Sequence, residues 1–328
     1  MKIHAMWQNY PTIQKELSQT LTLMEKTIQL NNAEVQGAIL DMIHAGGKLL
    51  RPAYQLLFSQ LGPNREPQKT IALAASLELL HTATLIHDDI VDVSPLRRGL
   101  PTIQARFGND VAVYAGDYLF ICCFKLLTQY TSSLRSIELN SNSMEKILVG
   151  ELGQMNMRYD YTGGKDAYLD NIRGKTAELF GLSCFVGAYE SGLNQVTANN
   201  ARQIGLNIGM AFQIIDDVLD YSEDATTIGK PVLQDVQQGV YSLPLLLALE
   251  SKAAALLPLL AKKEQLTDEE AQEIFTLVQQ SDGVAKARQL AAKYTDDALK
   301  GIAKLPETPQ KTRENLLQLT ATILKRHS

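Results

Sequence analysis

Six aspartates in two short repeats are the residues whose type and spacing most clearly point to chemistry. The pattern Asp-Asp-x-x-Asp occurs at residues 88–92 and again at residues 216–220, each time at the end of an apolar run. On a helix, positions i, i+1 and i+4 project to one side, so each repeat is predicted to present three carboxylates to a common point. Such charge beside apolar surface is costly unless a cation neutralises it. Oxygen donors alone favour a hard cation, and Mg²⁺ is expected where phosphates are handled.

Basic residues lie near both acidic repeats. Lys48 and Arg51 follow two glycines and stand three positions apart, which predicts neighbours on one helical face. The other basic motifs are Arg97-Arg98, Lys175-Thr176 and Lys230. Basic groups bind phosphates directly, whereas carboxylates bind phosphates only through a metal ion. A site with both kinds of group can therefore hold two diphosphates, one bridged by Mg²⁺ and one bound by Lys and Arg.

The plain alternative is a set of solvated surface charges. A single acidic repeat would leave that alternative about as strong as a metal site, and a lone Lys/Arg pair is more often a solvated surface. Two repeats with basic motifs nearby favour a diphosphate site. The sequence has no Walker loop and no Rossmann glycine fingerprint, which argues against a nucleotide-binding enzyme.

Bulk composition limits the class of protein. The 328 residues, 45% of them hydrophobic, supply a core, and no linker-like stretch divides them, so we expect a single domain over residues 1–328. The net charge of −5 argues against nucleic acid as a partner. Cys122, Cys123 and Cys184 lie in apolar sequence and are expected to be buried free thiols. Without a signal-like start or an uninterrupted apolar run of membrane length, we expect a cytoplasmic protein with no membrane span.

Apolar positions recur at helical spacing almost throughout the chain. The expected helices span residues 12–31, 33–60, 68–92, 109–131, 143–160, 167–191, 196–222, 240–262, 268–280, 283–304 and 309–326. Few stretches alternate with period two, so a sheet is not expected, and the fold class is all-α, a single large helical bundle. Thr267 to Glu270 has the form of a capping box that opens a late helix.

Two of these segments, 70–92 and 205–221, are apolar almost all round, which marks them as central helices. The acidic repeats lie at their ends. A bundle built in this way would place the two carboxylate clusters facing each other across the mouth of a deep cavity.

An ordered series of motifs between about residues 40 and 250 resembles the trans-prenyltransferases, the polyprenyl diphosphate synthases of the farnesyl/geranylgeranyl synthase superfamily. The motifs read GGKLLRP, LELLHTATLIHDDIVD, RRGLPTI, FGNDVAVYAGDYLF, GELGQ around Glu151 and Gln154, KTAELF, GMAFQIIDDVLDY, GKP and SLP. The resemblance extends to the catalytic component of hexaprenyl and heptaprenyl diphosphate synthases. It implies an all-α enzyme, usually dimeric, that joins isopentenyl diphosphate head-to-tail to an allylic diphosphate with Mg²⁺.

The resemblance also implies roles for individual residues. The metal-binding groups for the allylic diphosphate would be Asp88, Asp89, Asp92, Asp216, Asp217 and Asp220. The allylic-diphosphate contacts would be Arg97, Lys175, Thr176, Gln213 and Lys230, and the isopentenyl-diphosphate pocket would be Lys48, Arg51, His81 and Arg98. The catalytic set would be Asp88, Asp89, Asp92, Asp216, Asp217 and Lys175. A histidine on an apolar helix is more often structural, which we expect for His87, but the family pattern favours a pocket role for His81.

The chemistry of such a site needs no protein nucleophile, because the isopentenyl double bond attacks. The departing diphosphate must be stabilised as its charge develops, which Mg²⁺ and lysines would do. An apolar cavity that excludes water would protect the allylic cation, and bound substrates would be held in register. The released diphosphate can take the final proton, which accounts for the lack of a general-base motif.

Two positions depart from the family pattern. Val240 stands where the family commonly has Lys, and Gln104 stands where many members have His. The loss of a cation at Val240 predicts weaker allylic-diphosphate binding with activity retained.

Product length is predicted from the residues below the first acidic repeat. Ala83 and Thr84 lie four to five residues before Asp88, roughly 6–7 Å deeper along a helix, and neither is bulky. Leu80, another turn down, is only a moderate obstruction. We therefore expect a product longer than farnesyl diphosphate, of the hexaprenyl to octaprenyl class used for quinone side chains. Closure of the tunnel by a neighbouring helix or subunit would instead give geranylgeranyl diphosphate.

Other functions fit the sequence less well. A terpene cyclase usually carries an Asn/Ser/Glu metal motif on the second helix and has no use for the pocket of Lys48 and Arg51. An inactive partner subunit tends to lose acidic residues, and this chain keeps all six. We expect a homodimer; Val240 leaves open the alternative of a catalytic component that needs a small second subunit.

Overall fold

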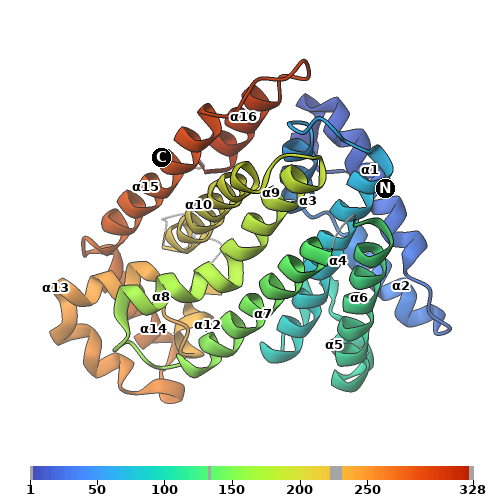
Figure 1. Ribbon diagram of the computed structural model, residues 1–328. Helices are drawn as coiled ribbons and strands as arrows, with labels where there is room; N and C mark the ends of the chain where they lie inside the picture. Colours follow the sequence, from blue (N-terminus) through green and yellow to red (C-terminus); the bar gives the residue numbers. More distant parts are fainter. Residues whose placement is uncertain (1–2, 132–133, 222–230, 325–328) are drawn as a thin grey trace. The chain divides into compact units, whose positions relative to one another are not determined.

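The computed structural model describes residues 3–131, 134–221 and 231–324, and this part of the chain is almost wholly helical (Figure 1). The all-α fold class is therefore confirmed. The described residues contain one pair of short antiparallel strands, β1 (Leu96–Arg97) and β2 (Leu100–Pro101). This hairpin, which the apolar periodicity did not predict, directly follows the first acidic repeat.

The helices of the first half of the chain are η1 (Ala5–Asn9), α1 (Pro11–Thr27), α2 (Ala33–His44), α3 (Leu50–Ser59), α4 (Pro67–Val91), α5 (Ile103–Phe107), α6 (Asn109–Tyr130) and α7 (Leu134–Asn156). Those of the second half are α8 (Gly164–Ile172), the π-helical turn η2 (Arg173–Ala177), α9 (Glu178–Glu190), α10 (Gln195–Leu219), α12 (Pro231–Gln237), α13 (Leu243–Leu260), η3 (Lys263–Gln265), α14 (Asp268–Gln279), α15 (Gly283–Ala303) and α16 (Thr312–Leu324).

The prediction of one continuous helix over residues 33–60 is wrong. Helix α2 ends at His44 and α3 begins at Leu50, because Gly46 and Leu49 have the positive φ angles of 88° and 51°. Left-handed backbone cannot continue a right-handed helix, and Gly46 adopts it without steric cost. Lys48 consequently lies in the connecting segment and does not share a helical face with Arg51.

A second difference lies in the segment that was expected to be one helix over residues 167–191. The chain there runs from α8 into the π-helical turn η2 and then into α9. A π turn widens the helix by one residue and often marks a functional site. Helix α7 also begins at Leu134, earlier than the predicted residue 143. By contrast, the capping box of α14 is confirmed, with Thr267 and Glu270 each accepting a hydrogen bond from the other's backbone N–H.

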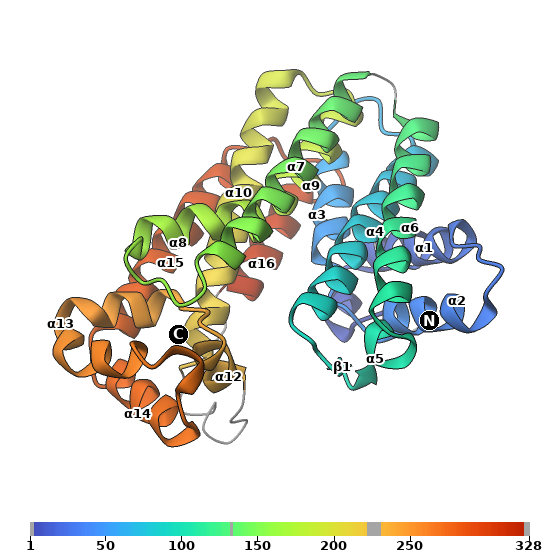
Figure 2. The same ribbon diagram turned by 90° about the horizontal axis from the view of Figure 1, so that it is seen from below.

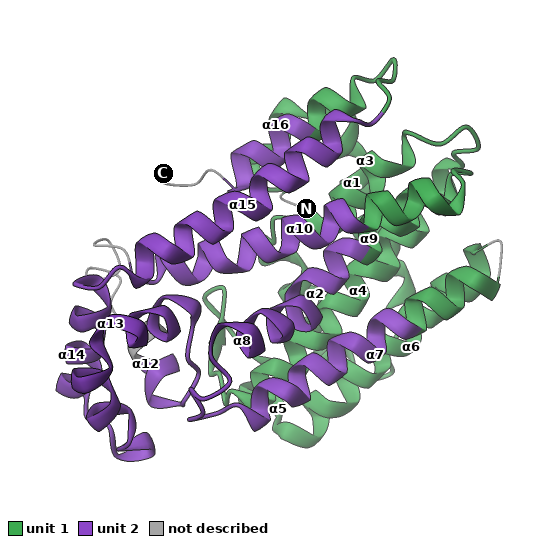
Figure 3. Cartoon of the chain, turned by 60° about the vertical axis from the view of Figure 1, so that its left-hand side comes forward, with its two compact units in different colours: residues 1–141, 182–202, 306–316 green, residues 142–181, 203–305, 317–328 purple. Residues whose placement is uncertain are grey.

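The chain divides into two compact units (Figure 3). Unit 1 comprises residues 1–141, 182–202 and 306–316, and unit 2 comprises residues 142–181, 203–305 and 317–328. Several helices, among them α7 and α10, contribute residues to both units. The first acidic repeat belongs to unit 1 and the second to unit 2. The single-domain expectation and the expected cavity between the repeats stay predictions.

In unit 1, α4 lies alongside α6 and also packs against α1 and α3 (Figure 2). Its buried residues occupy nearly every side of the helix, as expected of a central element. His87 of α4 packs against Gly116 of α6: a Cβ added at Gly116 would lie 2.4 Å from Nε2 of His87. The centroid of the His87 ring lies 5.4 Å from that of Phe120. The glycine therefore lets α6 approach the end of α4, and His87 has the structural surroundings that were expected.

In unit 2, the end of α10 is buried in an apolar cluster that includes residues of α8, α13 and α15. Met210, Ile214 and Val218 of α10 are all buried there, one helical turn apart. This stripe fixes the rotation of α10 and therefore determines the direction in which the second acidic repeat at its end projects.

Three helices among the described residues are long and apolar enough to cross a membrane by length and composition alone: α4, α6 and α13. The buried share of the most apolar 18-residue segment is 72% in α4 and 44% in both α6 and α13. Burial in the core therefore accounts for most of the apolar character of α4. The absence of a membrane span stays a prediction.

Glycine at position 187 is predicted to be essential to the stability of unit 1. A Cβ at Gly187 of α9 would lie 2.3 Å from the backbone oxygen of Gln55 in α3. Gly187→Ala should therefore destabilise the chain by about 1–3 kcal/mol in chemical denaturation, because backbone atoms must separate. The matched control is Gly37→Ala within α2, where a Cβ meets no atom within 4 Å; it should stabilise by about 0.5–1 kcal/mol. Equal stability of Gly187→Ala and the unmodified chain would contradict this close contact.

Candidate functional site

The three aspartates of the first acidic repeat differ in burial. Asp89 is only 2% exposed; its Oδ1 accepts a hydrogen bond from Nε of Arg97 at 2.7 Å and forms an ion pair with an Nη of Arg97 at 2.7 Å. Asp88 is half-buried, and Asp92 is exposed at the end of α4. Burial raises the pKa of Asp89, and the Arg97 guanidinium opposes that shift. Arg97, expected at the allylic diphosphate, is thus an ion-pair partner of the acidic repeat in this structure.

The second acidic repeat, in unit 2, likewise has a buried middle aspartate and more exposed outer aspartates. Asp217 is 8% exposed and accepts a hydrogen bond from the hydroxyl of Tyr168 at 2.6 Å and one from Nε2 of Gln213 at 2.8 Å. Burial raises the pKa of Asp217, and the two donors lower it. Asp216 and Asp220 are half-buried. Tyr168 could not be predicted as a partner of Asp217, because it lies on α8, far from α10 along the chain.

The middle aspartate of each repeat is therefore turned toward donors of its own unit. Among the described residues, no three His, Cys, Asp or Glu side chains converge closely enough to hold a metal ion. The prediction that each repeat presents three carboxylates to a metal ion stays a prediction. A buried carboxylate must be satisfied by hydrogen-bond donors, and protein donors satisfy Asp89 and Asp217 here.

The outer carboxylates of the repeats still fit a hard cation. They are Asp88, Asp92, Asp216 and Asp220, spaced i and i+4 on their helices. Their donor atoms are all oxygen, as Mg²⁺ prefers. Burial, followed by the carboxylates of Asp217 and Asp235, raises the pKa of Asp220 to about 7. A cation at this position would offset that accumulation of negative charge. Asp235 of α12 was not singled out from the sequence, since it belongs to no acidic repeat.

Two of the residues expected at the allylic diphosphate form a hydrogen-bonded series that leads to the second repeat. The Thr176 hydroxyl donates to Oε1 of Gln213 at 2.9 Å, and Gln213 in turn donates to Asp217. Lys175, the residue before Thr176, donates through Nζ to side chains of α7. The structure therefore joins Thr176, Gln213 and Asp217, with Gln213 as a bridge. Lys230 lies outside the described residues.

The predicted isopentenyl-diphosphate residues of unit 1 meet around α4. An Nη of Arg51 on α3 lies 3.2 Å from Nε2 of His81 on α4. Burial, then the charges of Arg51 and Arg98, hold the pKa of His81 well below its usual value, so the imidazole is neutral and can accept from Arg51. The backbone carbonyl of Lys48 accepts a hydrogen bond from the indole of Trp7 at 2.8 Å.

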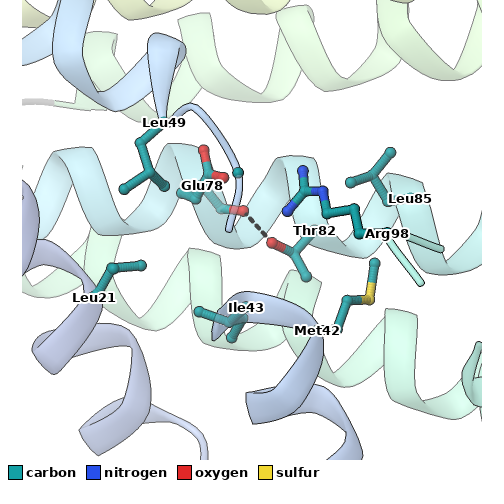
Figure 4. A pocket seen from close by; sticks show the side chains of 9 residues that line it. Leu21, Met42, Ile43, Leu49, Glu78, Thr82, Leu85 and Arg98 are labelled. Carbon is teal, nitrogen blue, oxygen red and sulfur yellow. Dashed lines mark hydrogen bonds between the residues drawn. The ribbon is translucent and has the colours of Figure 1, made fainter. Parts of the chain in front are cut away.

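A small pocket lies beside these basic residues (Figure 4). Arg98, Glu78 and Thr82 line it, with apolar side chains of α1 and α2 opposite. Gly47 lets the guanidinium of Arg98 approach closely, because a Cβ at this position would lie 2.9 Å from an Nη of Arg98. Burial raises the pKa of Glu78, whereas Arg51 and Arg98 lower it. Glu78 lies among cations and was not predicted as a site residue. Its position in an apolar run, three residues before His81, could have indicated it.

Arg97 and Arg98 are consecutive in the hairpin, but their side chains reach different partners. Arg98 and Gly99 form its two-residue turn with φ angles of 51° and 79°, as a type I′ turn requires. Arg97 on β1 binds Asp89, while the guanidinium of Arg98 reaches the pocket of Glu78. One short hairpin thus serves both the acidic repeat and the basic pocket of unit 1.

The residues expected to govern product length are placed in α4, upstream of Asp88. Ala83 is fully buried, Leu80 is buried, and Thr84 is half-buried with its hydroxyl donating to the carbonyl of His81 at 2.8 Å. Their side chains are small or moderate in size, as the sequence indicated.

The two departures from the family pattern have local roles. Gln104 on α5 donates through Nε2 to the carbonyl of Ser94 at 2.9 Å, which ties α5 to the loop after the first repeat. The backbone N–H of Val240 donates to the carbonyl of Asp235 at 2.8 Å, and its side chain is half-buried.

Comparison with known proteins decides the family. A model of polyprenyl synthetases matches residues 32–278, more than half of the chain. The chain belongs to the polyprenyl synthetase family. It is accordingly a trans-prenyltransferase, as the acidic and basic motifs predicted.

Relatives of this polyprenyl synthetase make products of different lengths, according to their names. Heptaprenyl diphosphate synthase component 2 of Bacillus subtilis is 31% identical over 303 residues, 92% of this chain and 86% of that protein. The structure of geranylgeranyl pyrophosphate synthase from Lactobacillus brevis has a TM-score of 0.94 and 43% identity, covering 98% of this chain and 99% of that one. A polyprenyl synthase from Caulobacter crescentus, complexed with calcium and isoprenyl diphosphate, has a TM-score of 0.89 and 31% identity over 97% of each chain.

In this polyprenyl synthetase, the hydroxyl of Tyr168 is predicted to be needed to hold Asp217. Tyr168→Phe should cost about 1.5–3 kcal/mol of unfolding free energy at neutral pH, because a buried carboxylate loses a charge-assisted hydrogen bond. Tyr294→Phe is the matched control, since Tyr294 packs against the same apolar cluster; it should leave stability within about 0.5 kcal/mol. Urea unfolding curves of both variants measure the difference, and an equal, small effect would show that the bond to Asp217 adds no stability.

Proposed function

We propose that this chain condenses isopentenyl diphosphate head-to-tail with an allylic diphosphate, farnesyl diphosphate being the expected primer, to give a trans-polyprenyl diphosphate longer than C15. The observation that supports the proposal is that α4 in unit 1 bears an acidic repeat and also contacts basic side chains. Its end bears the acidic repeat, and His81, two turns earlier, meets Arg51 beside the pocket of Arg98. A carboxylate cluster and a guanidinium cluster on one helix suit two diphosphates bound in different ways.

We propose Mg²⁺ as the cofactor. The residues that would hold it are Asp88, Asp92, Asp216 and Asp220. When bound, the ion would stabilise the negative charge that develops on the departing diphosphate. The calcium and isoprenyl diphosphate in the Caulobacter crescentus structure support a divalent ion in this role. Asp89 and Asp217, the middle aspartates, would orient the repeats through Arg97 and Tyr168.

The protein side chains would act mainly by binding and orientation. Arg51 and Arg98, together with Lys48, would bind the isopentenyl diphosphate, and neutral His81 would hold Arg51 in place by accepting its N–H. Lys175, Thr176 and Lys230 would contact the allylic diphosphate. Arg97 would share its guanidinium between that diphosphate and Asp89. The isopentenyl double bond would then attack the allylic carbon as the diphosphate leaves, and this diphosphate would take the final proton.

We propose a product of the hexaprenyl to octaprenyl class, of the kind used for quinone side chains. Ala83 supports this length, because it is small, buried and about five residues before the first aspartate. The heptaprenyl name of the Bacillus subtilis relative agrees with it. Geranylgeranyl diphosphate is the second candidate, which the name of the 43% identical Lactobacillus brevis protein favours.

The test of the proposed function is a product assay. Purified chain would be incubated with Mg²⁺, isopentenyl diphosphate and farnesyl diphosphate, and the products sized by mass spectrometry. A product longer than C20 is expected. Geranylgeranyl diphosphate as the only product would keep the reaction and overturn the proposed length. No product from farnesyl, geranyl or dimethylallyl primers, with or without a second subunit, would overturn the function itself.

Ala83→Phe is predicted to shorten the product by at least one five-carbon unit, because a phenyl group would fill interior space upstream of Asp88. Mass spectrometry of the product distribution measures this independently of the yield. Ala83→Leu, a smaller increase in volume, should give an intermediate shift and serves if the phenylalanine variant folds poorly. An unchanged distribution in a folded variant would rule out Ala83 as a determinant of length.

We propose that the chain forms a homodimer through the exposed face of α6 in unit 1. Tyr114 is 75% exposed and Ile121 57%, and both lie on one side of that helix. Such an apolar helical face is typical of a surface that another subunit covers.

Light scattering of the unmodified chain should show a dimer, and Ile121→Glu should give a monomer. A monomeric unmodified chain that gains activity only with a small second protein would support the heteromer, which the name "component 2" of the relatives suggests.

We also propose a cytoplasmic location. Cys122, Cys123 and Cys184 are all buried and unpaired. Burial raises the pKa of each of these thiols, which keeps them in the unreactive protonated form. Free thiols of this kind are typical of a reducing compartment.

A further inference from the structure

Glu151 and Gln154 of the GELGQ motif have no role in the function described so far. Both lie on α7 in unit 2, one helical turn apart, and so project from the same side of the helix. Nζ of Lys175 donates to Oε2 of Glu151 at 2.8 Å and to Oε1 of Gln154 at 2.7 Å. Two acceptors on one rigid helix therefore determine where the Lys175 ammonium stands.

The backbone brings Lys175 and α7 unusually close together. A Cβ at Gly150 would lie 2.8 Å from the backbone nitrogen of Lys175, and a Cβ at Gly174 would lie 3.0 Å from the carbonyl oxygen of Lys146. The side chain of Asn171 also donates to the carbonyl of Gly150 at 2.9 Å. Glycines on both sides of this contact let the two backbones pack without intervening side chains. Lys175 is therefore fixed relative to α7 at its backbone as well as at its ammonium group.

The π-helical turn η2 contains Lys175 and lies directly against this part of α7. An inserted residue changes the direction in which the side chains of such a turn project, and π turns are frequent at functional sites. One turn later, buried Glu178 accepts a hydrogen bond from the Ser143 hydroxyl of α7 at 2.7 Å. Contacts between α7 and this segment therefore continue on both sides of Lys175.

We propose that Glu151 and Gln154 are positioning residues that hold the Lys175 ammonium in place for the allylic diphosphate. This inference rests on the proposed function and deepens it, because Lys175 is the proposed diphosphate contact. A free lysine side chain loses rotamer entropy when a ligand fixes it. If α7 fixes it beforehand, the bound diphosphate meets a cation already in position. A misplacement of about 1 Å can cost on the order of 100-fold in rate.

A plain ion pair would behave differently. The Lys175 side chain is 29% exposed and that of Glu151 is 23% exposed, so the ion pair alone would contribute little to stability. Its loss would then alter the unfolding free energy slightly and leave catalysis unchanged. The positioning role instead predicts an effect on turnover that depends on the presence of Lys175.

The experiment is a double-mutant cycle of Glu151→Ala and Lys175→Ala, measured as kcat, as KM for both substrates, and as affinity for inorganic diphosphate with Mg²⁺. Glu151→Ala should lower kcat by about 10- to 100-fold, change the KM for isopentenyl diphosphate by less than about twofold, and weaken diphosphate binding. In the Lys175→Ala background, Glu151→Ala should have no further effect on either quantity, because it acts through the lysine. Glu151→Gln, which keeps an acceptor oxygen, should retain more activity than Glu151→Ala.

Glu145→Gln is the matched control, since Glu145 is exposed on the same helix; it should behave like the unmodified chain. Normal kcat and diphosphate affinity in Glu151→Ala, or multiplicative losses in the double variant, would overturn the positioning role. If Glu151→Ala folds poorly, Gln154→Ala, which removes the other acceptor of the Lys175 ammonium, carries the same cycle. An unmodified chain that makes no polyprenyl diphosphate would overturn the proposed function, and the diphosphate-binding cycle would still decide whether Glu151 acts through Lys175.

Discussion

Burial of negative charge at the ends of two apolar helices is the constraint on which the rest of the site depends. A carboxylate that leaves water must be given donors. In unit 1, Arg97 supplies them to Asp89, and in unit 2, Tyr168 and Gln213 supply them to Asp217. These bonds explain why the hairpin follows α4 so closely and why α8 packs beside α10. Each repeat thus consists of one aspartate that anchors the helix end and two that stay nearer to the solvent.

The basic groups obey the complementary constraint, since cations crowded together must also be balanced. Around the pocket of unit 1, buried Glu78 lies among guanidinium groups, and His81 stays neutral because burial, and then the nearby arginines, lower its pKa. Around Lys175, the balance comes from Glu151. Arg51, Arg97 and Lys175 are therefore each accompanied by a carboxylate or a neutral acceptor of the protein. Such an arrangement keeps the cations ordered while no ligand is bound, and it lowers the ordering cost when a ligand arrives.

Much of this fold could be predicted from the sequence, because helical periodicity is strong and local. The segment of α4, the position of the acidic repeats at helix ends and the capping box at Thr267 all followed from spacing alone. The break before α3 could not, since Leu49 adopts left-handed backbone that leucine rarely signals. The partners Tyr168 and Glu78 were also missed. They act through contacts between elements that are distant in sequence, or through burial, and neither leaves a pattern in a single chain.

The hairpin of β1 and β2 has a consequence for how the two proposed substrates influence each other. Its consecutive arginines point to different places, Arg97 to the acidic repeat and Arg98 to the basic pocket, although one peptide bond joins them. A ligand that draws on one guanidinium would therefore act on the backbone that carries the other. Any change in affinity transmitted in this way is reciprocal, so each diphosphate would favour or oppose the other by the same factor. The hairpin would then act as a thermodynamic link between substrates that never touch the same side chain.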